Sequence, residues 1–295
     1  MHLVEATCLA HDGSKSLEAV ERAAVLAVQA QIIWESSKDA ECCNFNTDSS
    51  ADDNSPMMMI CNLVDARGRR DAVGTKKALE RVVEVMLETV KDVNHKSTML
   101  GHSPLIKASR SGHSAVVEPL LKHEKIDVNQ AKNDGATPLY IASQQGQLAV
   151  VDLLLKQEKI DVNQAENTGI TPLNIASQNG HSAVVELLLK HEKIDANQAN
   201  DDGATPLYMA SQEGQLVVVE LLLKHEEIDV NQARNDGATP LFMASQNGHL
   251  AVVDLLLKQE KIDVNQADND GATPLCIASQ KGHSAVVELL LKQEK

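Results

Sequence analysis

Three histidine–glutamate pairs are the residues of this sequence whose types could do chemistry. They begin at His123, His191 and His225. An imidazole next to a carboxylate can serve as a general acid–base pair, or the two can bind a metal ion. None of the pairs belongs to an H-E-x-x-H sequence, the spacing that places two zinc-binding histidines on one helix face. A histidine near a helix C-terminus also interacts favourably with the helix dipole, so we interpret the pairs as solvated surface residues.

Other catalytic and cofactor-binding patterns are missing from the sequence. It contains no G-x-S-x-G sequence, no Walker-type phosphate loop and no dinucleotide-binding glycine loop. The five cysteines are odd in number and lack C-x-x-C spacing, which argues against a zinc site or a disulfide framework; they are Cys8, Cys42, Cys43, Cys61 and Cys276. We therefore expect no catalysis, no cofactor and no metal.

Composition limits the classes of partner and the cellular compartment. The 295 residues include 27 basic and 42 acidic side chains, which gives a formal net charge of −15 and disfavours nucleic-acid binding. No basic segment followed by an apolar one begins the sequence, and the most apolar stretch, Ala23–Trp34, is too short and too polar to span a bilayer. We expect a monomer without signal peptide or transmembrane segment, located in the cytoplasm, with the nucleus as the alternative.

One basic run departs from this acidic background. Arg67–Lys77 holds five basic residues and a single acidic one. It is compatible with a docking loop, with a weak nuclear-import signal, or with a solvated loop that has no role. Nucleic-acid binding through this run is a further alternative, and it predicts an affinity that falls steeply with salt concentration.

The element that must position any site is a repeat of 34 residues. Thr-Pro-Leu recurs at this interval from Thr137 to Thr273, with a variant at Ser103, and Ala-Ser, Val-Val and Ile-Asp-(Val/Ala)-Asn-Gln-Ala recur in step with it. The clear units are 99–132, 133–166, 167–200, 201–234, 235–268 and an incomplete 269–295. Such a period is typical of a solenoid in which each unit stacks on its neighbours.

Local physics predicts the structure of the first half of a unit. Asp134-Gly135 favours a tight turn, because the aspartate bonds its own backbone and the glycine accepts a positive φ. Thr137 is a good helix N-cap, and Pro138 suits the first helical position, where its missing N–H costs nothing. A short helix is therefore predicted to follow and to end at Gly146.

The second half of the unit predicts another helix and an extended segment. A helix from Leu148 to about Glu158 would carry one apolar stripe that includes Val150 and Leu154. Ile160–Asn163 alternates apolar and polar residues with period two, as an extended segment does. One unit cannot bury its own stripe, so it must stack on copies of itself.

This order of turn, cap, helix stop and stripe closely resembles the ankyrin repeat. The resemblance implies an all-α ankyrin-repeat solenoid of stacked helix-turn-helix units with short β-hairpin fingers. The family's usual histidine after Thr-Pro-Leu is absent here, so the hydrogen bonds that it supports between repeats are in doubt; its place is taken by Ile106, Tyr140, Asn174, Tyr208, Phe242 and Cys276.

The first 98 residues carry weaker forms of the same landmarks. Val82-Val83 lies 34 residues before Val116-Val117, and Asp53–Met57 is similar to a degraded repeat turn. We interpret 50–98 as a divergent ankyrin repeat with an inserted basic loop. For 1–49 two interpretations stay open, a helical N-terminal extension and a degenerate capping repeat.

Differences between the copies point to candidate binding residues. By resemblance, the hairpin tips and the exposed face of the first helix form a concave groove that holds protein partners, and loops on a rigid scaffold are where binding is expected. The variable positions are Lys132, Glu166, Asn200, Arg234 and Asp268 at the hairpin, Tyr140, Asn174, Tyr208 and Phe242 on the helix, and Gln145, Asn179, Glu213, Asn247 and Lys281 before the stop glycine. Neutral drift is the alternative for each of these residues, and packing between repeats is the alternative for the aromatic row.

The expected floor of the groove is an uncharged row of Ser-Gln pairs. Its glutamines are Gln144, Gln178, Gln212, Gln246 and Gln280. Such donors and acceptors suit an extended peptide segment better than a ligand recognised by a point charge. The leading hypothesis is a non-enzymatic protein–protein interaction scaffold or adaptor. The alternative is a targeting arm of a larger enzyme complex, with the chemistry in a missing C-terminal domain or a partner subunit.

Overall fold

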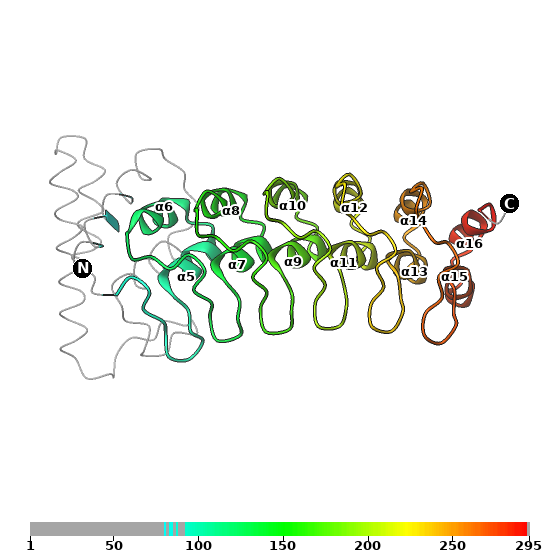
Figure 1. Cartoon of the computed structure of the whole chain (residues 1–295), viewed down its shortest axis with the longest axis horizontal. Coiled ribbons are helices and arrows are strands. Elements are labelled where there is room, and N and C mark those ends of the chain that lie inside the picture. The colour runs from blue at the N-terminus through cyan, green and yellow to red at the C-terminus, as the bar shows by residue number, and fades with distance from the viewer. Residues whose placement is uncertain (1–79, 81–82, 85–86, 88–91, 294–295) are drawn as a thin grey trace, which may run out of the picture. The chain divides into compact units, whose positions relative to one another are not determined.

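A computed structural model describes residues 80, 83–84, 87 and 92–293. Expectations for 1–79, which include the basic run and both interpretations of 1–49, lie outside these residues. The described part contains paired helices and no strand (Figure 1). The first helix of each pair is α5 (Pro104–Ser111), α7 (Pro138–Gln144), α9 (Pro172–Gln178), α11 (Pro206–Gln212), α13 (Pro240–Gln246) and α15 (Pro274–Lys281). The second is α6 (Ser114–Lys122), α8 (Leu148–Leu155), α10 (Ser182–Leu189), α12 (Leu216–Leu223), α14 (Leu250–Leu256) and α16 (Ser284–Leu291).

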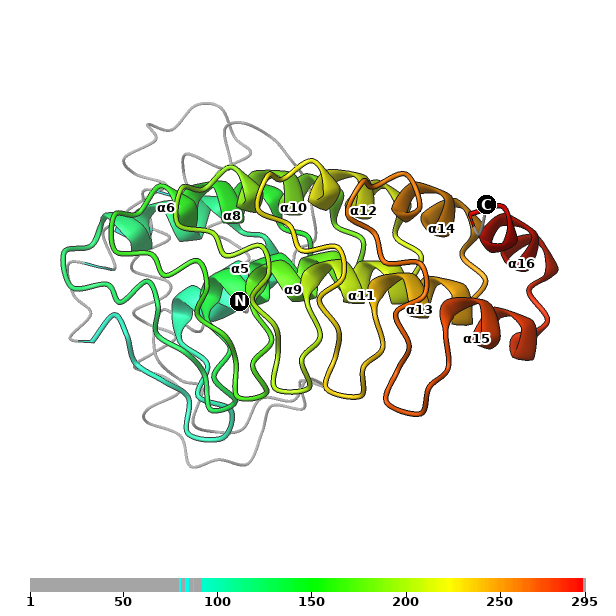
Figure 2. The ribbon, with the colours of Figure 1, turned by 45° about the vertical axis from the view of Figure 1, so that its right-hand side comes forward.

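The chain forms two compact units, one up to Asn133 and the other from Asp134 onward. In the second unit the first helices lie side by side in one layer and the second helices form another layer (Figure 2). Loops of similar shape join consecutive helix pairs on one side of the first layer (Figure 1). The all-α repeat solenoid predicted from the sequence is confirmed for this part of the chain.

The expected capping residues set the ends of the first helices. The Thr137 hydroxyl accepts a hydrogen bond from the Tyr140 amide at 3.1 Å, with Pro138 at the first helical position. A cap of this kind contributes about 1 kcal/mol. Beyond the helix the chain passes through Gly146 at φ 66°, in the left-handed region, as predicted.

The second helices are shorter than the apolar stripe predicts. Helix α8 ends at Leu155, three residues before Glu158. The Gln157 side-chain amide donates to the main-chain carbonyl of Leu153 at 3.2 Å, which satisfies one of the last carbonyls of the helix. The chain then leaves the helix, and Ile160 inserts its side chain into the core at 7% exposure.

Two predicted extended features are turns instead. The segment Ile160–Asn163 contains a turn, because the Asp161 carboxylate accepts a hydrogen bond from the Asn163 amide at 3.1 Å and competes with extended pairing. The hairpin fingers contain no strand in the described residues. The loops that begin at Glu166, Asn200, Arg234 and Asp268 are each closed by two main-chain hydrogen bonds. In one of them Arg234 N donates to Ala238 O at 2.9 Å and Gly237 N donates to Arg234 O at 2.8 Å, and no further pair extends these bonds into a β-ladder in the described residues.

The core is a series of interfaces between repeats. The leucine after the proline has no exposed surface at Leu139, Leu173, Leu207 and Leu241, and neither has the second valine of each stripe at Val151, Val185, Val219 and Val253. Alanine at the middle of each first helix, for example Ala210, is also fully buried and permits close approach of the neighbouring helix. Burial is thus repeated in small portions and needs few aromatic side chains.

The last described repeat shows what stacking contributes. Leu275 is half-buried and Ser279 is exposed, whereas the equivalent Leu241 and Ser245 have no exposed surface. The difference arises because no further repeat packs on α15 in the described part of the chain. Positions in 269–293 therefore serve as internal controls for contacts between repeats.

Candidate binding groove

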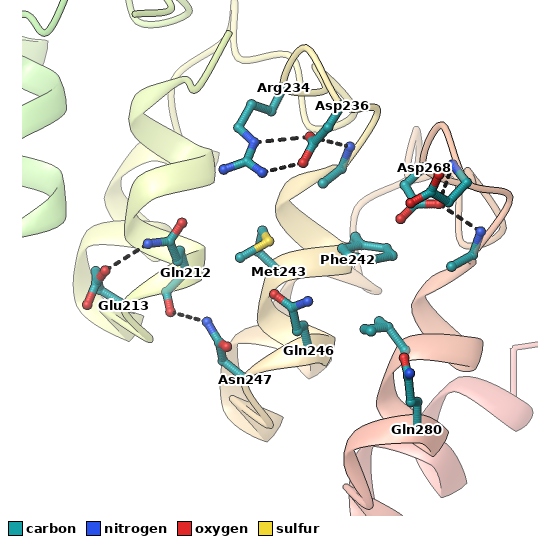
Figure 3. A pocket seen from close by; sticks show the side chains of 14 residues that line it. Gln212, Glu213, Arg234, Asp236, Phe242, Met243, Gln246, Asn247, Asp268 and Gln280 are labelled. Atoms are coloured by element: carbon teal, nitrogen blue, oxygen red, sulfur yellow. Dashed lines mark hydrogen bonds and ion pairs between the residues drawn. The ribbon is translucent and has the colours of Figure 1, made fainter. Parts of the chain in front are cut away.

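A groove of about 640 Å³ crosses the last three described repeats of the second unit. Figure 3 shows three rows of side chains: charged residues on the loops, apolar residues in the middle, and four amides with one carboxylate at the helix ends. The loop row consists of Arg234, Asp236, Asp268 and Asp270, and the middle row of Ala238, Phe242, Met243, Ala272 and Ile277. The helix-end row consists of Gln212, Glu213, Gln246, Asn247 and Gln280.

The middle row offers little surface to a ligand. Phe242, Met243 and Ile277 are only 4%, 8% and 7% exposed. They pack in one apolar cluster with Tyr208 and Met209 of the preceding repeat. The cluster joins neighbouring repeats and forms the floor of the groove, while the polar rows supply most of the accessible atoms.

Arg234 is held in place by two neighbours. Its guanidinium forms two hydrogen bonds with the Asp236 carboxylate, through Nε at 3.0 Å and through Nη2. It also lies over the ring of Tyr208, 5.5 Å from the ring centre, in cation–π geometry. The hydrogen bond from Arg234 lowers the pKa of Asp236, and burial raises the pKa of Tyr208.

The variable hairpin position has a structural task in three repeats. The Asp268 oxygen Oδ1 accepts the amides of Asp270 at 3.1 Å and Ala272 at 2.8 Å. Asn200 makes the equivalent pair of bonds, and so does the Glu166 carboxylate. Arginine cannot accept hydrogen bonds, and at that repeat the carboxylate of Asp236 accepts the Ala238 amide at 3.2 Å instead.

The helix-end row sits over a line of hydrogen bonds between repeats. The main-chain carbonyl of Gln144 accepts His181 Nε2, that of Gln178 accepts the Gln215 amide, and those of Gln212 and Gln246 accept His249 and His283, at 2.9–3.2 Å. His181, His249 and His283 therefore each cap the helix of the preceding repeat. Asn179 and Asn247 share this task at 3.0 and 2.8 Å.

The helix position after Thr-Pro-Leu does not form an exposed face in the repeats before the last. Tyr140, Asn174, Tyr208 and Phe242 are 7%, 0%, 1% and 4% exposed, so the expectation that they lie on an accessible surface is wrong. They are covered because the next repeat packs over this helix face, in agreement with the alternative of packing between repeats. Only Cys276, in the last described repeat, is exposed.

Asn174 supplies one bond to the next repeat, to Ala204, where the family's histidine is missing. Its side-chain amide donates to the carbonyls of Gln198 and Ala204 at 3.3 and 3.4 Å, and its Oδ1 accepts the Thr171 amide at 3.0 Å. A hydrogen bond between repeats at this position is therefore made by another residue type. The aromatic residues at the same position replace them with apolar contact.

The groove brings together eight of the predicted binding residues. These are Gln212, Glu213, Arg234, Phe242, Gln246, Asn247, Asp268 and Gln280. The others do not line it. Lys132 lies in the first unit, Lys281 is exposed at the end of α15, and Tyr208 is buried beneath Arg234. The rest belong to earlier repeats. Asp236 and Asp270 were missed because this loop position is aspartate in most copies, and a comparison of copies detects only differences.

The histidine–glutamate pairs form no metal site in the described residues. No group of three or more histidine, cysteine, aspartate or glutamate side chains in that part of the chain is arranged to hold a metal ion. The rings of His123 and His191 accept the main-chain amides of Lys125 and Lys193 at 3.2 and 3.3 Å, which gives these histidines a local capping role. Across the same residues, every helix is too short or too polar to cross a membrane.

Comparison with known proteins identifies the same repeat. The family described as ankyrin repeats (3 copies) matches residues 71–166, 159–234 and 227–295. Among solved structures, the crystal structure of EF0377, an ankyrin repeat protein, is 25% identical in sequence, and the match covers 69% of this chain and 99% of that chain with a TM-score of 0.61. None of the curated proteins matches. Because the family match extends over most of this chain's length, the chain belongs to the ankyrin repeat family.

Proposed function

We propose that this chain is a protein–protein interaction scaffold or adaptor that binds its partner in the groove and catalyses no reaction itself. Ankyrin repeats generally act as protein–protein interaction modules. The observation that carries the proposal is the groove, because it crosses three repeats and is lined by positions that differ between them, such as Glu213, Arg234 and Asp268. We further propose that the chain is a monomer, since a net charge of −15 opposes self-association. We propose the cytoplasm as its location, with the nucleus as the alternative.

The rigidity of the groove supports this function. Asn247 and His249 hold the end of α11, and the Asp236 carboxylate holds Arg234. Side chains fixed in this way lose little conformational entropy when a partner binds. The exposed atoms of the groove are thus presented in one arrangement, as a binding surface requires.

Affinity capture with the full chain as bait tests the proposal. The variant Gln246→Ala with Gln280→Ala removes two amides from the groove and leaves the main-chain bonds between repeats in place. The matched control is Glu220→Ala with Glu260→Ala, at exposed positions outside the groove. A partner retained by the native chain and by the control, but lost from the groove variant, supports the proposal. Equal retention by both variants moves the binding surface elsewhere.

A further inference from the structure

The groove holds four carboxylates and one cation, and the cation is already engaged. The carboxylates are Glu213, Asp236, Asp268 and Asp270. Arg234 neutralises Asp236 and rests on the Tyr208 ring. In the described part of the chain no ion pair reaches the other three carboxylates. The groove therefore carries uncompensated negative charge, with Asp268 and Asp270 on the loop side and Glu213 on the helix-end side.

Two of these carboxylates share one loop. Asp268 uses its oxygen Oδ1 to accept the amides of Asp270 and Ala272. Its second oxygen, Oδ2, makes no hydrogen bond to a described residue, and the same holds for the Asp270 carboxylate. Like charges so close in sequence repel each other, and a cation placed between them relieves this repulsion.

The remaining rows of the groove restrict what can carry that cation. The apolar floor is more than nine-tenths buried at Phe242, Met243 and Ile277, so apolar burial contributes little to recognition. The amides of Gln246 and Gln280 run parallel to the acidic loop row (Figure 3). They can pair with the free N–H and C=O groups of an extended polypeptide.

We propose, on the basis of the function proposed above, that the partner presents an extended segment bearing arginine, with one guanidinium bound by Asp268 and Asp270. Guanidinium is planar and offers five donors, which suits two adjacent carboxylates better than the single ammonium of lysine. Glu213, at the helix-end side of the groove, attracts a second basic side chain. Nucleic acid and acidic peptides are repelled by the same charges.

Fluorescence anisotropy with the full chain tests the inference. The labelled probe is a nonapeptide, Gly-Ser-Arg-Gly-Arg-Ser-Arg-Gly-Ser, and it is compared with versions in which lysine or glutamate replaces every arginine. The chain variant is Asp268→Asn with Asp270→Asn. Asparagine preserves the loop, because Asn200 makes the equivalent two hydrogen bonds in its own repeat. The matched control, Glu220→Gln with Glu260→Gln, removes the same charge outside the groove.

We expect the arginine probe to bind more tightly than the lysine probe, and the glutamate probe not to bind. The Asp268→Asn, Asp270→Asn variant should weaken binding of the arginine probe by about tenfold or more, and the control should leave it unchanged. Binding should also weaken as salt is raised from low to physiological concentration. This salt effect alone does not distinguish the loop from the rest of the acidic surface, so the two variants decide.

Three results overturn the inference: no binding of the arginine probe, equal binding of the glutamate probe, or the same loss of affinity in the variant and its control. None of them overturns the proposed function, which is judged by the capture experiment with the Gln246→Ala, Gln280→Ala variant. Capture that depends on the glutamines but not on Asp268 and Asp270 would leave a binding groove with a partner of different chemistry.

Discussion

The imidazole of His283 lies against Gly248 of the preceding repeat, so close that a Cβ atom on this glycine would meet ring atom Nδ1 at 2.6 Å. The other ring nitrogen, Nε2, donates to the carbonyl of Gln246 at 3.0 Å. One side chain therefore packs on the stop glycine and caps the helix before it. This arrangement recurs between His249 and Gly214 and links consecutive repeats.

The stop glycines allow the cost of this contact to be separated from backbone strain. Gly248 and Gly282 have similar φ angles, 72° and 77°, but nothing lies within 4 Å of a Cβ built on Gly282. Both alanine substitutions place a side chain on a left-handed backbone, which is strained, and only Gly248→Ala also displaces the His283 ring. We expect Gly248→Ala to lower the free energy of unfolding by about 1–2 kcal/mol more than Gly282→Ala. Urea unfolding of the two variants measures the difference. Equal losses of unfolding free energy would show that the His283 ring does not oppose a side chain at Gly248.

The capping role of the histidine can be tested with a substitution that the chain already contains. His249→Ala leaves the carbonyl of Gln212 with one donor fewer, so we expect a loss of about 1 kcal/mol. His249→Gln should recover most of it, because Gln215 donates to the carbonyl of Gln178 at 3.2 Å in the repeat before. Thermal unfolding of the three proteins provides the test. If glutamine is no better than alanine, the hydrogen bond is not what the histidine contributes.

A second contact between repeats is made by the asparagine of the Ile-Asp-Val-Asn segment. The Asn231 amide donates to the carbonyl of Lys261 at 2.6 Å, and its Oδ1 accepts the amide of Asp263 at 2.9 Å. The equivalent side chain of Asn265 is exposed and makes no such bond in the described residues. Asn231→Ala should therefore cost about 1–3 kcal/mol, and Asn265→Ala less than about 0.5 kcal/mol. Chemical denaturation checks the pair, and a large effect at Asn265 would show that the segment acts within its own repeat.

Tyr140 makes stability depend on pH in the alkaline range. Burial, with the nearby Glu166 and Asp134 carboxylates, raises its pKa from 10.0 to about 12. The folded chain keeps the phenol proton between these values while the unfolded chain loses it. The stabilisation is thus complete below pH 10 and is lost as pH rises to about 12, by about 2–3 kcal/mol in total.

Tyr140→Phe is the control for this prediction, because phenylalanine occupies the same position at Phe242. The variant should lose less stability than the native chain between pH 9 and 12. Urea unfolding at several pH values, with phenolate absorbance followed in parallel, provides the measurement. Parallel losses in both proteins would assign the alkaline instability to other groups.

Local features of the repeat could be predicted because neighbouring residues determine them. Thr137 and Pro138 define the start of a helix, and Gly146 its end, through bonds made within a few positions of the chain. The end of α8 could not be placed in the same way. It depends on a side-chain amide, that of Gln157, returning to a carbonyl of its own helix.

Contacts between repeats were harder to predict, because a 34-residue period does not reveal which side chains face the next copy. Asn174 and Tyr208 vary between copies and so resemble binding residues, yet both are covered by the following repeat. The position of Asp270 is aspartate in most copies, so a comparison of copies does not single it out, yet Asp270 lines the groove. Variation among copies shows which positions tolerate substitution, whereas stacking between repeats determines which side chains are exposed.

The measurement that tests the proposed arginine site most directly is a titration of the isotope-labelled full chain with the arginine nonapeptide, in which the backbone amide signals are monitored by NMR. We predict that the largest shifts occur at Asp268, Asp270 and Gln280, and that the Asp268→Asn, Asp270→Asn variant loses them. Shifts confined to the second helices α12 and α14, or shifts that survive in the variant, would contradict the proposed site.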